Sequence, residues 1–158
     1  MPATISEGAT GPEVREAQYL LARFRALTPS DIDGTFGPVT DKGVREFQAE
    51  QGLAVDGVIG PLTWAALQSQ FSIPPTLSMG SSGPIVGRLQ AILNDIGPQM
   101  TPPAGPIAVD NDFGPATRAM VEGFQHWGGV GADGVVGLQT WAVSMHAAGQ
   151  ELVDVVGL

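Results

Sequence analysis

The stretch DGTFGPVTDKGVREFQAEQGLAVDGVIGPLTW, residues Asp33–Trp64, decides the fold of this chain. It contains one turn sequence twice, Asp-Gly-x-Phe/Ile-Gly-Pro-x-Thr, at Asp33–Thr40 and again at Asp56–Thr63. Glycine accepts positive φ in a turn, aspartate bonds to nearby backbone, and proline suits the first position of a helix. Each copy is therefore predicted to be a tight turn that starts a helix.

The whole stretch recurs downstream as DNDFGPATRAMVEGFQHWGGVGADGVVGLQTW, residues Asp110–Trp141, and the two copies superimpose without a gap. Upstream, Gly11-Pro12 matches Gly83-Pro84, so the repeat extends toward the amino terminus of each copy. The second copy is five residues longer between these points, and the insertion falls in the proline-rich segment 97–109. The chain is thus a tandem duplication with one lengthened loop.

Apolar residues at three- and four-residue spacings follow the turn and Gly-Pro sequences, which is the pattern of amphipathic helices. We therefore predict an all-α fold of two tandem three-helix bundles, with the third helix of the second bundle running to about Ala148. Residues 1–71 form repeat one, 72–78 a stiff proline-containing linker, 79–148 repeat two, and 149–158 a tail. The helix starts are predicted to follow six glycines: Gly11, Gly37, Gly60, Gly83, Gly114 and Gly137.

The composition excludes several classes of function. A net charge of −9 with seven basic residues disfavours nucleic acid, which requires a basic surface. The chain has no cysteine and no apolar run long enough to span a membrane. The first ten residues lack the basic and apolar regions of a signal peptide. A location outside the cytoplasm would therefore need a trimmed signal or another route, such as phage lysis or an injection machine.

The combined pattern, DGxFGPxT followed by VxxFQ, a glycine and VDGxxGPxTW, resembles the peptidoglycan-binding domain found beside cell-wall hydrolases. The resemblance covers about Glu7–Leu67 and Met79–Met145. It implies binding of bacterial peptidoglycan, at its stem peptides, without turnover. The protein would then target or anchor itself or a partner to the wall, periplasm or cell exterior.

The resemblance places a binding groove where the turns meet the second helix of each repeat. Hydrogen bonds to peptide amides and ammonium groups would come from polar side chains there, and two arginines are candidate carboxylate clamps. An alternative for two of the candidates, Gln48 and Gln125, is a structural hydrogen bond between helix and turn, because a buried amide must be hydrogen-bonded. Trp127 is either part of the core or a ring that stacks on a sugar. Besides Trp127, the candidate ligand-binding residues are Asp33, Thr40, Arg45, Gln48, Asp110, Thr117, Arg118 and Gln125.

No catalytic, metal or cofactor site is predicted. Asp110–Asp112 resembles the start of a calcium loop, but Pro115 and Val121 occupy the positions of its required Gly and Glu. Ser144–Gly149 resembles the start of a murein-peptidase zinc motif, yet Val153 stands where its aspartate ligand belongs. The rival hypothesis is a structural or adaptor protein of a phage tail, injection machine or wall-enzyme complex. Its protein contact would be the apolar tail or the 97–109 loop.

Overall fold

The computed structural model describes residues 3–100, 102–145 and 150–158. Its contacts divide the chain into two units, residues Met1–Ile73 and Pro74–Leu158, hereafter unit 1 and unit 2. Within the described residues the secondary structure is helical, with isolated backbone bridges and no strand. The predicted all-α class is confirmed.

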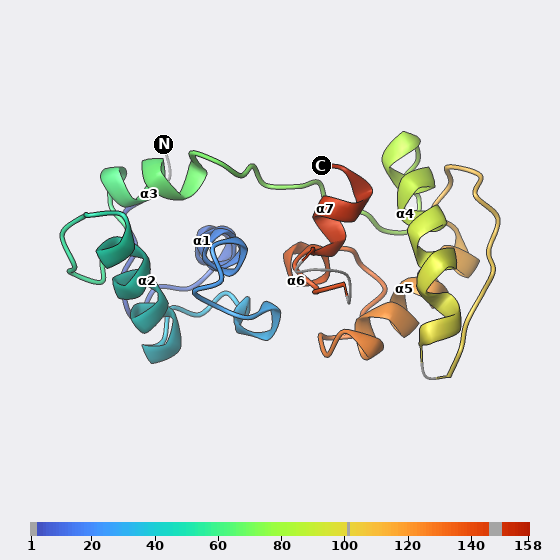
Figure 1. Ribbon diagram of the computed structural model, residues 1–158, viewed down its shortest axis with the longest axis horizontal. Helices are drawn as coiled ribbons and strands as arrows, with labels where there is room; N and C mark the ends of the chain where they lie inside the picture. Colours follow the sequence, from blue (N-terminus) through green and yellow to red (C-terminus); the bar gives the residue numbers. More distant parts are fainter. Residues whose placement is uncertain (1–2, 101, 146–149) are drawn as a thin grey trace. The chain divides into compact units, whose positions relative to one another are not determined.

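Unit 1 contains three α-helices, α1 (Pro12–Arg23), α2 (Pro38–Glu50) and α3 (Pro61–Gln68), and a short 3₁₀ turn, η1 (Pro29–Asp31). Helix α1 contacts both α2 and α3, and Figure 1 draws it nearly end-on, to the right of α2. Each α-helix begins at a proline directly after a glycine, as predicted. Proline has no amide hydrogen, and the first residue of a helix has no use for one.

Unit 2 repeats this plan with α4 (Pro84–Ile96), the 3₁₀ turn η2 (Gly97–Gln99), α5 (Pro115–Trp127) and α6 (Leu138–Trp141). These α-helices also begin directly after the predicted glycines. A further short helix, α7 (Leu152–Val156), follows near the carboxyl end of the chain.

The predicted length of the third helix in unit 2 is wrong. Helix α6 ends at Trp141 because the next backbone groups pair across the chain instead of continuing the helix: Leu152 N–H donates to Val143 O at 3.0 Å, and Met145 N–H donates to Gln150 O at 2.8 Å. Residues 146–149 lie outside the described part. The chain then returns as α7, which contacts α4 and α6.

Helix α7 takes the place of the second half of α3. In unit 1, Leu67 near the end of α3 is fully buried, and α3 packs on α1. In unit 2, α6 is too short to reach the equivalent part of α4, and Leu152, Val153 and Val156 of α7 are buried there instead. The tail therefore docks on unit 2 as a helix.

Two extended segments, here called the straps, complete the cores. Residues 3–5 form the first strap: the Trp64 indole donates to Ala3 O at 2.9 Å, and Ile5 pairs with Ile59. Residues 75–77 form the second: the Trp141 indole donates to Pro75 O at 2.8 Å, and Leu77 pairs with Val136. Residues 75–77 fall within the segment that the sequence suggests as a linker, but they belong to unit 2.

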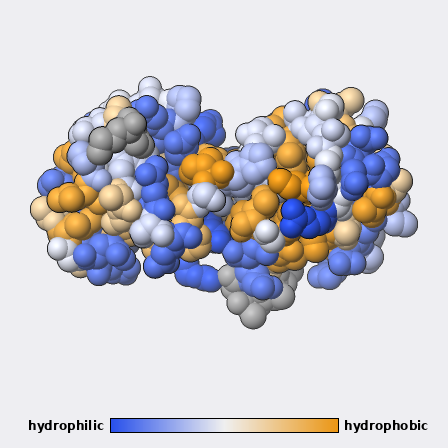
Figure 2. All heavy atoms as spheres, turned by 90° about the horizontal axis from the view of Figure 1, so that it is seen from above, coloured by the Kyte–Doolittle hydropathy of each residue, from blue (hydrophilic) through white to orange (hydrophobic). Residues whose placement is uncertain are grey.

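The aromatic side chains at matching positions of the two repeats are core residues. Phe47, Trp64, Phe124 and Trp141 are all at most 2% exposed. On the face of the units seen in Figure 2, apolar and polar residues are interspersed.

Among the described residues, no helix has the length and apolar character needed to cross a membrane.

Candidate ligand-binding site

Each turn is held by a buried glutamine on the preceding helix. The glutamine amide donates to the turn aspartate, to a backbone carbonyl of the turn and to a threonine at the start of the next helix, while its oxygen accepts from turn N–H groups. We call this arrangement the glutamine lock. The glutamines, each at most 1% exposed, are Gln18, Gln48, Gln90 and Gln125.

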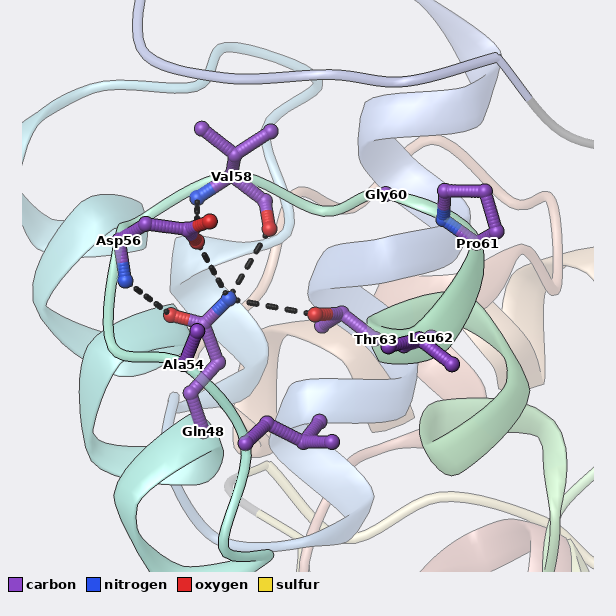
Figure 3. Close-up of a pocket in the computed structure, with 9 residues that line it drawn as sticks. Gln48, Ala54, Asp56, Val58, Gly60, Pro61, Leu62 and Thr63 are labelled. Atoms are coloured by element: carbon purple, nitrogen blue, oxygen red, sulfur yellow. Dashed lines mark hydrogen bonds between the residues drawn. The ribbon is translucent and has the colours of Figure 1, made fainter.

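The lock of Gln48 is drawn in Figure 3. Its Nε2 donates to Asp56 Oδ1 at 2.9 Å, to Val58 O at 2.9 Å and to Thr63 Oγ1 at 3.2 Å. Its Oε1 accepts from the backbone N–H groups of Asp56 and Gly57, both at 3.1 Å. Both polar atoms of the Gln48 amide form hydrogen bonds to other groups of the protein, so the hydrogen-bonding capacity of this side chain is used within the fold.

The structure groups the predicted site residues differently from the sequence analysis. Asp33 and Thr40 bond to Gln18 of α1, whereas Gln48 of α2 bonds to the next turn, at Asp56 and Thr63. The predicted alternative, that the glutamines join helix to turn, is confirmed.

Unit 2 has the same division. Asp110 and Thr117 bond to Gln90 of α4, and Gln125 of α5 bonds to Asp133 and Thr140. Sequence reasoning missed Gln18 and Gln90, although a signal was present. Aligning Gly11 with Gly83 also aligns these two glutamines.

The lock favours the ionised form of three turn aspartates, Asp33, Asp56 and Asp110. The backbone N–H of Val58 and then the Gln48 amide lower the pKa of Asp56. For Asp33 and Asp110 the first cause of the lowered pKa is the amide of Gln18 or Gln90, followed by a backbone N–H of the turn. These carboxylates are exposed, and the lock uses Oδ1 of each, so each turn presents a negative charge to solvent.

Arg45 and Arg118, the candidate carboxylate clamps, each pair with a carboxylate of their own helix. Arg45 Nε lies 2.9 Å from Asp41 Oδ2, and Arg118 Nε lies 2.9 Å from Glu122 Oε1. The order is reversed between the units, since Arg118 is the counterpart of Asp41. Either way, the pair covers the positive-φ glycine of the adjacent turn, Gly57 or Gly134. Arg45 Nη2 also donates to Asp56 O at 3.3 Å.

Trp127 is half-buried and its ring centroid lies 5.7 Å from that of Phe124. It therefore extends the aromatic core of unit 2 while keeping part of its surface in contact with solvent.

A pocket of about 180 Å³ opens beside the Gln48 lock in unit 1. Its wall combines apolar groups with the exposed Asp56 carboxylate, and Leu62 at its edge is 75% exposed (Figure 3). Such a mixture suits a small ligand with both an apolar group and a positive charge. The lining residues are Gln48, Leu53, Ala54, Asp56, Val58, Gly60, Pro61, Leu62 and Thr63.

Within the described residues, no group of three or more His, Asp or Glu side chains is placed to hold a metal ion. His146 and Gly149 of the partial zinc motif lie outside these residues.

The family described as "Putative peptidoglycan binding domain" matches residues 10–67 and 82–143, one match in each unit. The chain belongs to the peptidoglycan-binding domain family. The two matched regions coincide with the two copies of the helix-and-turn plan, so the binding domain is present in tandem. The predictions of an all-α fold and of tandem peptidoglycan-binding domains are confirmed.

Several relatives are cell-wall enzymes by name. The zinc D-Ala-D-Ala carboxypeptidase of Streptomyces albus G is 44% identical over 62 residues, covering 39% of this chain and 24% of that enzyme. The N-acetylmuramoyl-L-alanine amidase CwlL of Bacillus licheniformis is 28% identical, covering 87% of this chain and 44% of the amidase. The chain thus spans less than half the length of either enzyme. The crystal structure of the SleB N-terminal domain matches at 35% identity with a TM-score of 0.40, covering 44% of this chain and 93% of that domain.

Proposed function

We propose that this chain binds bacterial peptidoglycan through its stem peptides and does not itself cleave them. The observation that carries the proposal is the pocket beside the Gln48 lock, which joins an exposed leucine, Leu62, to an ionised carboxylate, Asp56. Membership of the peptidoglycan-binding family supports the ligand class.

Stem peptides are short chains of alanine, acidic and diamino acid residues. They offer methyl groups, amides and, where the diamino acid is not cross-linked, an ammonium group. A methyl group can contact Leu62, and an ammonium group can pair with the Asp56 carboxylate, whose Oδ1 is used by the lock. Arg45 is not part of the pocket lining, but it donates to the Asp56 carbonyl and is a candidate partner for a peptide carboxylate.

Binding without turnover is supported by how the pocket side chains are used. Gln48 and Thr63 are buried and hydrogen-bonded to each other, so neither is placed to act as a nucleophile or to carry a proton to a ligand.

The exposed carboxylates of the other turns are proposed as secondary contacts. Asp33 and Asp110 each use Oδ1 in a lock, as Asp56 does, and their carboxylates are solvent-exposed. Trp127 keeps its proposed role as a stacking surface for a sugar ring. With this ligand, the protein acts at the cell wall, where it anchors itself or a partner.

The test is retention of the purified chain on insoluble peptidoglycan, compared with a control protein of similar size and charge. We expect retention that falls when free amines of the peptidoglycan are acetylated, because acetylation removes the partner of Asp56. No release of dye from labelled peptidoglycan is expected. Retention no better than the control contradicts the binding proposal, and dye release contradicts the absence of turnover.

A further inference from the structure

The two units carry the same locks but different surfaces around them. In unit 1, three aliphatic side chains within or directly before the turn sequences are strongly exposed, at 50–75%. At every counterpart position in unit 2 the residue is smaller or polar. The pairs are Val39 and Ala116, Val55 and Ala132, and Leu62 and Gln139.

From this difference we infer that unit 1 is the peptide-binding module and that Leu62 determines its specificity. The occupant is a stem peptide whose free ammonium pairs with Asp56 and whose neighbouring alanine methyl contacts Leu62. Unit 2 does not take this ligand at its equivalent turn. The inference rests on the proposed function and names where, and by which contact, the ligand is selected.

The scaffold does not explain the difference between the units. Gln48 and Gln125 make matching bonds, to Asp56 and Thr63 in one unit and to Asp133 and Thr140 in the other, all between 2.9 and 3.2 Å. Both locks therefore hold the turn in the same way.

Charge does not explain it either. Each turn keeps one exposed aspartate, and each has an arginine–carboxylate pair packed over its glycine. An ammonium group would meet a similar electrostatic environment in both units. What changes is the apolar wall.

Several lining positions change together. Leu53 is replaced by Val130, Ala54 by Gly131 and Pro61 by Leu138, in addition to the change from Leu62 to Gln139. Leu62 is 75% exposed, so a ligand that covers it removes apolar surface from water. Gln139 cannot supply this term, because a polar amide stands where Leu62 has its apolar methyl groups.

The experiment uses the full chain and a reciprocal pair of variants, Leu62→Gln and Gln139→Leu, with Asp56→Asn and Asp133→Asn as a second matched pair. Asparagine keeps the Oδ1 acceptor of each lock and removes only the charge. The probe is the soluble peptide L-Ala-γ-D-Glu-L-Lys-D-Ala-D-Ala, titrated by calorimetry and by NMR of the backbone amides. Thermal unfolding confirms that each variant is folded.

We expect Leu62→Gln to weaken binding by about five- to tenfold, the range for losing one apolar contact. Asp56→Asn should weaken binding several-fold and reduce its dependence on salt, while Asp133→Asn changes the Kd by less than about twofold. Gln139→Leu should leave the first site unchanged and create a second, weaker one at Asp133.

Equal losses from the unit 1 and unit 2 variants would overturn the inference, as would peptide-induced shifts centred on residues 130–140. Retention on insoluble peptidoglycan without binding of the soluble peptide would also overturn it, while leaving the proposed function standing. Failure of both assays would remove the proposed function itself.

Discussion

The amide nitrogen of Gln48 lies 3.2 Å from the hydroxyl oxygen of Thr63, and this bond joins the last turn of α2 to the first turn of α3. Because both groups are buried, neither can be satisfied by water if the other is removed. The same bond joins Gln125 to Thr140 in unit 2, at 2.9 Å. The locks are therefore structural. Their effect on the proposed ligand is indirect, through the turn that each lock holds in place.

Replacing Gln48 with alanine should destabilise unit 1 by about 2–4 kcal/mol, since it leaves the Thr63 hydroxyl and two turn N–H groups without their partner. Urea denaturation measures the loss. Gln51→Ala, directly after the same helix, is the matched control: Gln51 is exposed, so its change should stay within about 0.5 kcal/mol. Similar losses for the two variants would mean that the lock contributes little.

Gly57→Ala should cost more stability than Gly52→Ala, although both glycines have nearly the same positive φ, 72° and 69°. A Cβ on Gly57 would meet the Asp41 carboxylate and lie 2.9 Å from Arg45 Nη2, whereas a Cβ on Gly52 meets nothing within 4 Å. We expect about 1 kcal/mol for Gly52→Ala from backbone strain alone, and clearly more for Gly57→Ala.

A double-variant cycle separates the two causes in this comparison. If contact with the ion pair causes the excess, then it should shrink when Asp41 and Arg45 are both replaced by alanine. An excess that persists in this background would assign the cost to the backbone instead.

Gly87→Ala should destabilise unit 2, and Asn111→Gly should reverse the loss. The Asn111 side chain lies directly over Gly87, where a Cβ would clash with its Oδ1, and Asn111 has a positive φ of 65° that glycine adopts freely. At the equivalent positions of unit 1 the glycine is in the turn and not on the helix: Arg15 stands where unit 2 has Gly87, and Gly34 stands where it has Asn111. The double variant should regain wild-type stability to within about 1 kcal/mol in a thermal melt. Additive losses would contradict this pairing.

The sequence contains enough information to predict the helix starts and the core aromatics, because both follow from local rules. A glycine before a proline fixes where a helix begins, and Phe47 and Trp64 recur at matched positions of an amphipathic pattern. The straps could not be predicted in the same way. Residues 3–5 and 75–77 are short, and their bonds to the turns and the indoles span some 60 residues of sequence.

The end of α6 and the grouping of the locks have a different cause. Nothing in the local sequence after Trp141 forbids a longer helix, and only the pairing of residues 143–145 with 150–152 ends it. The predicted groove places Gln48 and Gln125 at the turn before their own helix, whereas each of these side chains bonds to the turn that follows the helix. Spacing alone does not distinguish these choices, since both turns have the same residues.

Stability should decrease as pH falls below the ordinary aspartate pKa of 3.8. The folded pKa of Asp33, Asp56 and Asp110 is lowered, so the stabilisation is complete above 3.8 and is lost as pH falls through the folded values. Converting the three residues to asparagine should flatten the pH dependence of the unfolding midpoint between pH 2 and about 4. An unchanged slope would show that other carboxylates dominate.

Val153→Asp in α7 should unfold unit 2 or cost at least about 3 kcal/mol, because Val153 is 4% exposed and a carboxylate there would be buried among apolar groups. Asp154→Asn, at the neighbouring exposed position, is the control for α7 itself. Amide hydrogen exchange should show the loss of protection spreading from α7 into α4, against which α7 packs, while α1 to α3 stay protected. Protection of α4 that survives in Val153→Asp would mean that α7 is an accessory, and that four-residue α6 closes the core of unit 2 without it.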